Sequence, residues 1–218
     1  PLSPPRHAGG RINWPDWSGD LVAIIASGPS TKGVDLKVLR GAAKIIAIKQ
    51  NVDLCPWADV VYGCDAAWWR YRRGLSEFKG MKICWAGNGL TDYPEIKRVQ
   101  IAPGKREKYS DDLHFDHGTI GAGGNSGFQA LNLAIQFGAR RIILIGFDMN
   151  DRSGKHWYGR NNWPMANNPD STNFNRWIAA FYYASQAIKA AGIEVVNSSP
   201  TSSLKCFPIK TIEQSISE

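Results

Sequence analysis

The stretch from Gly121 to Asp148 constrains the fold of this 218-residue chain more than any other part of the sequence. Its apolar residues recur every three or four positions as far as Gly138, which is typical of a helix with one buried face that ends at a glycine. Residues Arg141–Ile145 then form an almost continuous apolar run, as expected of a parallel strand that is covered on both faces. Asp148 lies just beyond this strand, where open α/β sheets bind their ligands.

The loop before this helix predicts an anion-binding helix start. Asn125 or Ser126 is placed to cap the first turn with its side chain. The backbone N–H groups around Gly127 and the positive end of the helix dipole attract groups such as phosphate. We therefore expect Asn125, Ser126 and Gly127 to begin the helix and also to bind a ligand.

Further apolar runs alternate with turns and helical segments, which predicts a doubly wound, mostly parallel, Rossmann-like α/β sheet. A chain of this length builds one well-buried core, so we expect a single nucleotide-binding domain over residues 20–218 behind an extended arm at 1–19. The expected strands are residues 20–25, 44–48, 60–65, 81–85, 99–101, 141–145 and 193–197. Besides the central helix, the expected helices are residues 32–39, a segment rich in Trp and Arg that ends near Lys79, and residues 171–191.

Two stretches lack any periodic pattern. Residues 105–124 combine polar, glycine and histidine residues, which predicts a mobile loop. Residues 150–170 are longer than an irregular segment of a packed domain normally is without a function. We interpret this second stretch as a long lid loop.

The expected strands end in polar residues or glycine that a parallel sheet would bring to one edge. These residues are Ser27, Gly28, Asn51, Asp65 and Asp148. The turn that contains Gly28 is neither the G-x-G-x-x-G dinucleotide fingerprint nor a P-loop. We expect Gly28 and Gly127 to face one shared crevice with free backbone N–H groups, where a side chain would displace a phosphate.

A formal net charge of +7 favours an anionic partner such as a nucleotide, a sugar acid or nucleic acid. The densest basic runs are Arg70–Arg73 and Lys105–Lys108.

Four scattered cysteines without a C-x-x-C pair, and a start without the apolar core of a signal peptide, predict a cytoplasmic protein with reduced thiols. No apolar run reaches the ~18–20 residues of a membrane span. The sequence is compatible with an oligomer.

Three blocks of the sequence resemble a known superfamily. The blocks are Ala26–Ser30, then Asn125–Phe128 followed by Gly138–Asp148, and finally Val195–Leu204. They are similar to blocks of the bacterial lipooligosaccharide sialyltransferases, and to those of motility accessory factors and 6-hydroxymethylpterin diphosphokinase-like proteins. Order and spacing agree over roughly residues 20–208. Small proteins with these blocks occur in bacteriophage genomes, so the chain resembles a small phage-type member.

The resemblance implies a nucleotide site, because the sialyltransferase blocks contact a cytidine monophosphate sugar. Asparagines after the second and third strands also hold the nucleotide in that family. Asn51 or Lys49 occupies the first of these positions, and Asp65 stands at the second, where the chain departs from the sialyltransferase pattern. The nucleotide-binding residues expected in this way are Ser27, Gly28, Ser30, Asn51, Asp65, Asn125, Ser126, Gly127 and Asp148.

The resemblance also implies a catalytic base in the lid. The sialyltransferase base is a histidine after the I-x-L-x-G-x-D strand, and His156 is the histidine found there in this chain. An alternative alignment places Arg160 at that position. Tyr158 or Arg160 would offset the charge on the departing phosphate.

Three functions are therefore open. The first is a glycosyltransferase that uses a nucleotide-activated sugar, needs no cofactor or metal, and acts on an acceptor glycan. The second is a diphosphokinase-like enzyme that uses ATP and magnesium, with Asp65, Asp148 and Asp151 as carboxylates. The third is a phage protein that binds a nucleotide without catalysis, or a variant enzyme with DNA as its acceptor. The spacing of His114 and His117 matches no strong zinc pattern.

Overall fold

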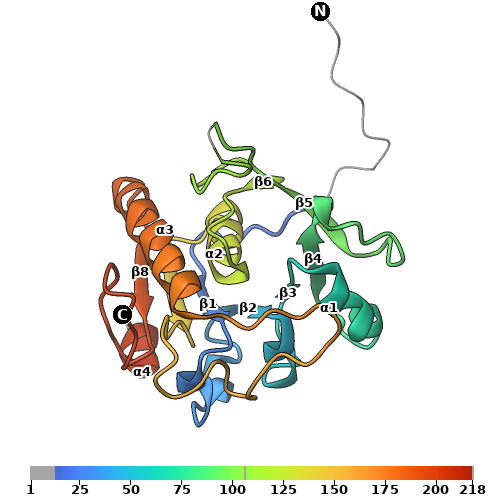
Figure 1. Ribbon diagram of the computed structural model, residues 1–218. Helices are drawn as coiled ribbons and strands as arrows, with labels where there is room; N and C mark the ends of the chain where they lie inside the picture. The colour runs from blue at the N-terminus through green and yellow to red at the C-terminus, as the bar shows by residue number, and fades with distance from the viewer. Residues whose placement is uncertain (1–12, 106, 218) are drawn as a thin grey trace, which may run out of the picture.

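The computed structural model describes residues 13–105 and 107–217, and its centre is a single parallel sheet (Figure 1). The strand order is β6-β5-β4-β3-β2-β1-β7-β8. The strands are β1 Leu21–Ile25, β2 Lys44–Ile48, β3 Val60–Tyr62, β4 Met81–Trp85, β5 Lys97–Ile101, β6 Thr119–Ile120, β7 Arg141–Ile145 and β8 Glu194–Asn197. The helices are α1 Ala66–Tyr71, α2 Ser126–Gln136, α3 Ser171–Ala190 and α4 Ile212–Ser217. This architecture confirms the predicted doubly wound, Rossmann-like α/β fold.

Helices cover both faces of the sheet. Successive side chains of a strand point to opposite faces, so each strand contributes to two apolar cores. Val22 and Ile24 of β1 belong to the apolar core on the side of α2 and α3. Ala23 and Ile25 belong to the core on the other side, with residues of α1 and α4 (Figure 1). Burial on both faces is why the strands are almost continuously apolar.

The order of the strands reverses between β1 and β7. From β1 the chain builds the sheet outwards as far as β6, and α2 then returns it to β7 on the other side of β1. Ile25 pairs with Ala47 on one side and with Ile145 on the other, so these strands end at the same edge. Open α/β sheets bind ligands at such a switch point.

Several expected helices are shorter than the sequence indicated. Residues 29–39 form two short 3-10 helices, Pro29–Thr31 and Leu36–Leu39, separated by Gly33 at φ +88°. The helix expected to reach Lys79 ends at Tyr71, because positive φ angles at residues 73–75 break it. The two-residue strand β6 and the helix α4 were not expected.

Residues 114–121 are bonded to α2, although the sequence suggested a mobile loop over residues 105–124. Asn132 is fully buried, and its Oδ1 accepts hydrogen bonds from the backbone N–H groups of His114 (3.1 Å) and Gly121 (2.9 Å). Gln136 donates to the carbonyl oxygens of His114 and Thr119. Two buried amide side chains therefore bond this loop to the helix.

Residues 1–12, most of the expected N-terminal arm, lie outside the described residues. Of the rest, Trp17 is buried against the Phe137 ring at the end of α2, and its backbone N–H donates to the Phe137 carbonyl. Within residues 13–105 and 107–217, no helix has the length and apolar character needed to cross a membrane.

Candidate nucleotide site

A cavity of about 350 Å³ opens at the carboxyl ends of β1, β2, β3 and β7, at the switch point of the sheet. This volume lies within the ~300–1,000 Å³ range of small-molecule sites. The strand ends form its floor, the start of α2 and the first turns of α3 form one wall, and residues of the lid form the other. The lid extends from β7 across to the region of α1 and returns to α3 (Figure 1).

The start of α2 faces this cavity with its positive end. Asn125 caps the helix, since its Oδ1 accepts from the Phe128 N–H at 2.9 Å. Within the described residues, no hydrogen bond involves the backbone N–H groups of Ser126 or Gly127, and both residues line the cavity. The geometry suits an anion, because unpaired N–H groups and the helix dipole act together there.

Gly28 also lines the cavity, but its role differs from the expected one. Its N–H is not free, because it donates to the Gly146 carbonyl at 2.9 Å. Its φ angle of −59° is ordinary for any residue. A Cβ atom at this position would overlap the Asp148 carboxylate and the Gly146 carbonyl. Gly28 is thus required by the close approach of the β1 and β7 turns, and not by a positive φ or a free N–H group.

Asp148 connects the same two turns. It is buried, and its carboxylate accepts hydrogen bonds from the Ser30 hydroxyl (2.7 Å) and, more weakly, from the Ser30 N–H (3.3 Å). Ser30 does not line the cavity, whereas Asp148 does. This pair holds the turn after β1 against the end of β7.

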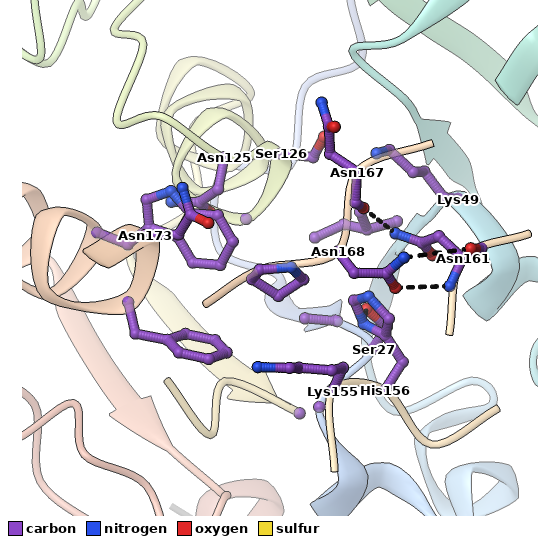
Figure 2. Close-up of a pocket in the computed structure, with 18 of the residues that line it drawn as sticks. Ser27, Lys49, Asn125, Ser126, Lys155, His156, Asn161, Asn167, Asn168 and Asn173 are labelled. Carbon is purple, nitrogen blue, oxygen red and sulfur yellow. Dashed lines mark hydrogen bonds between the residues drawn. The ribbon is translucent and has the colours of Figure 1, made fainter. Parts of the chain in front are cut away.

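His156 of the lid lies beside Ser27 in the cavity (Figure 2). Its Nδ1 is 2.9 Å from the Ser27 hydroxyl, and its ring stacks on Tyr158 with 5.0 Å between ring centroids. Its Nε2 is buried and has no hydrogen-bond partner among the described residues. Burial, together with the positive charges of Lys49 and Lys155, lowers the pKa of His156 to about 4, so the ring is neutral at pH 7.

Tyr158 is connected to an asparagine cluster in the same lid. Its hydroxyl donates to Asn161 at 2.8 Å, and burial raises its pKa to about 12. Asn168 accepts from the Asn161 N–H (2.8 Å) and donates to the Asn161 carbonyl (3.2 Å). In Figure 2, Asn161, Asn167 and Asn168 lie on one side of the cavity, and Asn173 and Asn125 lie on the other. Because its pKa is raised, Tyr158 keeps its proton and remains a hydrogen-bond donor at neutral pH.

Two lysines bring positive charge to the cavity. Lys49 follows β2 with a φ of +52°, forms an ion pair with Asp65, and lies 5.8 Å from the centroid of the Trp163 ring. Lys155 pairs with Asp151 at 2.6 Å. Both lysines and Asp65 line the cavity, but Asp151 does not.

The structure does not bring all the expected site residues together. Ser27, Gly28, Asp65, Asn125, Ser126, Gly127, Asp148, His156 and Tyr158 line the cavity. Ser30 and Asn51 lie behind it, and Arg160 is exposed and does not line it. In this placement Arg160 has no contact with the cavity from which to offset the charge of a departing phosphate.

The expected site residues did not include several residues of the cavity wall. Lys155, Asn161, Asn168 and Asn173 line the cavity but were absent from the expected set, and Lys49 was weighed only as an alternative to Asn51. The dense asparagines of the lid were a signal in the sequence, since amides in a loop beside a ligand site suit polar ligands. The sequence did not show which residues of the lid would lie against the strand ends.

The expected basic surface is partly neutralised by ion pairs. Arg70 pairs with Asp92 at 2.8 Å, and Arg72 makes a bidentate contact with Asp53 at 2.7 and 3.0 Å. Within the described residues, no group of three or more His, Cys, Asp or Glu side chains is arranged to hold a metal ion.

The sequence matches no model of a known protein family and no curated protein. The structure is similar to a solved one, the sialyltransferase CST-II in complex with a trisaccharide acceptor and CMP. The TM-score is 0.53 at 14% sequence identity, and the match covers 87% of this chain and 85% of that one. The chain therefore has a sialyltransferase-like fold.

Proposed function

We propose that the protein is a glycosyltransferase that uses a nucleotide-activated sugar, with a cytidine nucleotide as the first candidate. The observation that carries the proposal is the contact between His156 and Ser27 in a cavity that also contains the open start of α2. The neutral imidazole lines the same cavity as this helix start, whose geometry suits an anion. The likeness of the fold to a sialyltransferase crystallised with CMP supports the choice of nucleotide.

In the proposed reaction, an acceptor hydroxyl attacks the anomeric carbon of the donor sugar. His156 takes the hydroxyl proton on Nε2, and the bond from the sugar to the phosphate oxygen breaks, so the nucleotide leaves with the bonding electrons. Ser27 orients the ring by accepting a hydrogen bond from Nδ1–H, which leaves the lone pair on the unpartnered Nε2. Ser27 is thus a positioning residue in this scheme.

The low pKa of His156 fits an enzyme whose substrate is an anion. Burial is the main cause of this low pKa, and the charges of Lys49 and Lys155 lower the pKa further. A bound phosphate would offset those charges and raise the pKa of His156 towards neutrality, where a general base is most effective. The substrate would in this way increase the basicity of the group that it needs.

The charge that develops on the leaving phosphate has several candidate partners. We propose that the N–H groups of Ser126 and Gly127 and the ammonium groups of Lys49 and Lys155 bind it. Tyr158 remains protonated, and its hydroxyl would donate to the phosphate after turning from its present acceptor, Asn161. With these donors we propose that no metal or other cofactor is needed. The asparagine amides of the lid, which both donate and accept hydrogen bonds, suit the hydroxyl groups of a glycan.

The alternative with ATP and magnesium has weaker support. Its three carboxylates have separate partners: Asp65 pairs with Lys49, Asp148 with Ser30, and Asp151 with Lys155. Mg²⁺ needs carboxylates that converge on one point together with phosphate oxygens. Calorimetry separates the two proposals. CMP that binds in EDTA supports the first, and ATP that binds only with Mg²⁺ supports the second.

The decisive assay for catalysis is hydrolysis or transfer of a CMP-activated sugar. We expect His156→Ala to lower the turnover number by about 10²–10⁴-fold, the usual contribution of a general base, while CMP still binds. The matched control is His117→Ala, because His117 is exposed and stacks on Trp14, away from the cavity. Activity undiminished in His156→Ala removes the proposed base. CMP binding without any turnover in the parent protein favours the non-catalytic alternative.

A further inference from the structure

Asn51 lies beneath the lid and not in the cavity, although the sequence suggested a nucleotide contact. It is fully buried in a 3-10 helix, Lys49–Asp53, that directly follows β2. Its Nδ2 donates to the Ile48 carbonyl at 2.6 Å, and its Oδ1 accepts from the Trp157 indole N–H at 2.8 Å. The side chain is therefore fixed in orientation, with its oxygen towards the lid.

Trp157 is the neighbour of His156 in the chain, and it is held at two points. Its indole is bonded to Asn51, and its backbone N–H donates to the Ser27 carbonyl at 2.9 Å. The His156 ring contacts the hydroxyl of the same serine. The lid is thus fastened to the ends of both β1 and β2 at the residue that follows the histidine.

We propose that Asn51 is a positioning residue for His156, and that it acts through the Trp157 indole. By holding the indole against the end of β2, Asn51 fixes the backbone from which His156 reaches Ser27 and the cavity. The inference rests on the proposed function only where it concerns catalysis. The position of His156 is a structural matter that is measured separately.

Two features distinguish this bond from an ordinary buried contact. Residues 151–154, which precede His156 in the lid, are exposed. The bonds from Trp157 to Asn51 and Ser27 therefore hold this part of the lid to the strand ends. In addition, the Asn51 backbone carbonyl already accepts from the N–H groups of Leu54 and Cys55, which hold the 3-10 helix without the side-chain oxygen. That oxygen is consequently available for the lid alone.

The first test is an NMR titration of the His156 ring in the ligand-free protein. Trp157→Phe keeps an aromatic ring but removes the indole N–H. We expect the pKa of His156 to rise from about 4 towards the ordinary value near 6.5, because the histidine leaves its buried place between Lys49 and Lys155. An unchanged titration in Trp157→Phe overturns the proposal.

The matched control is Trp69→Phe, which also removes a buried indole donor. The Trp69 Nε1 donates to the Gly63 carbonyl at 2.8 Å, the same length as the bond to Asn51, but Trp69 is not in the lid. We expect the His156 titration of this control to match the parent protein. A control that shifts as much as Trp157→Phe would show a general loss of packing and would also overturn the proposal.

Substitutions of Asn51 complete the test. Asn51→Leu should shift the titration as Trp157→Phe does, because both variants lose the bond between the side-chain oxygen and the indole N–H. The double variant Asn51→Leu/Trp157→Phe should be no worse than the poorer single variant, since both remove one bond. Additive effects would contradict a shared bond. If Asn51→Leu does not fold, the comparison of Trp157→Phe with Trp69→Phe decides the matter.

Activity adds an independent measurement. In a protein that transfers or hydrolyses a CMP-sugar, Trp157→Phe should lower kcat on the order of tenfold or more and leave the KM of the donor within about twofold, because misplacing a base affects chemistry more than binding. A higher KM with unchanged kcat overturns the positioning role. A parent protein without turnover refutes the proposed function, and the NMR titration still decides the role of Asn51.

Discussion

At the scale of single residues, two turns approach each other so closely that the identity of one glycine is fixed. Gly28 lies against the Asp148 carboxylate and the Gly146 carbonyl, which together leave no room for a Cβ. We expect Gly28→Ala to lower the free energy of unfolding by about 1–3 kcal/mol, the usual cost of overpacking a filled site. Denaturant unfolding followed by fluorescence measures this change.

Gly41→Ala is the control for the loss of glycine itself. Gly41 has a φ of +83° with no atom within 4 Å of its virtual Cβ, so its substitution costs backbone strain and not overlap. The overlap at Gly28 and the backbone strain at Gly41 should lower stability by similar amounts. The affinity for CMP is therefore the measurement that distinguishes the two variants. Gly28→Ala should disturb the cavity and weaken binding, and Gly41→Ala should not. Equal affinities in both variants would contradict the steric account of Gly28.

His156 links the stability of the protein to pH. Its pKa is about 4 in the folded protein and near 6.5 in an unfolded chain. Between these values the unfolded chain binds more protons, so stability falls as the pH drops from 6.5 to 4. We expect His156→Gln to lose less stability than the parent protein between pH 7 and pH 4.5, with exposed His117→Gln as the control. Parallel pH profiles of His156→Gln and the parent would show that His156 is not buried as described.

At the scale of elements, α2 does more than its apolar pattern indicated. Its apolar face packs against the sheet, and its buried amides hold the loop before it. We expect Asn132→Ala to lower stability by about 1–3 kcal/mol, because the N–H groups of His114 and Gly121 lose their acceptor.

Hydrogen exchange measures this effect locally. In Asn132→Ala the amides of His114 and Gly121 should exchange faster than in the parent protein, while those of β1 change only with global stability. Ser185→Ala is the control, because among the described residues the Ser185 hydroxyl bonds only to the Tyr182 carbonyl within α3. Unchanged exchange at both amides of the Asn132 variant would mean that the loop is held by other contacts.

The sequence predicted the elements unevenly, for physical reasons. Long strands such as β7 are covered on both faces, so they read as apolar runs, and α2 and α3 show clear periodicity. Strand β6 has two residues and no readable pattern. The lid was recognised by its irregular composition, but the bond from Asn51 to Trp157 joins residues that are far apart in the sequence. Such a contact depends on the complete fold and leaves no local pattern.

At the scale of the whole molecule, the order of the strands decides where a ligand can bind. The reversal between β1 and β7 opens a crevice at their carboxyl ends, and α2, α3 and the lid enclose it. The expected parallel sheet predicted that Ser27 and Asp148 would meet at this edge, with Gly127 facing the same crevice, and the structure places all three around one cavity. The parallel sheet explains why these three residues lie together. The sequence did not predict that Lys49 and Lys155 line the same cavity, because Lys155 reaches it only when the lid is folded.

The most direct test of the central claim is a crystal structure of the protein soaked with CMP in the presence of EDTA. We predict that the phosphate lies at the N–H groups of Ser126 and Gly127, close to His156, Lys49 and Lys155, and that no metal ion accompanies it. A nucleotide bound elsewhere on the molecule, or in the cavity with its phosphate away from the start of α2, would contradict the account.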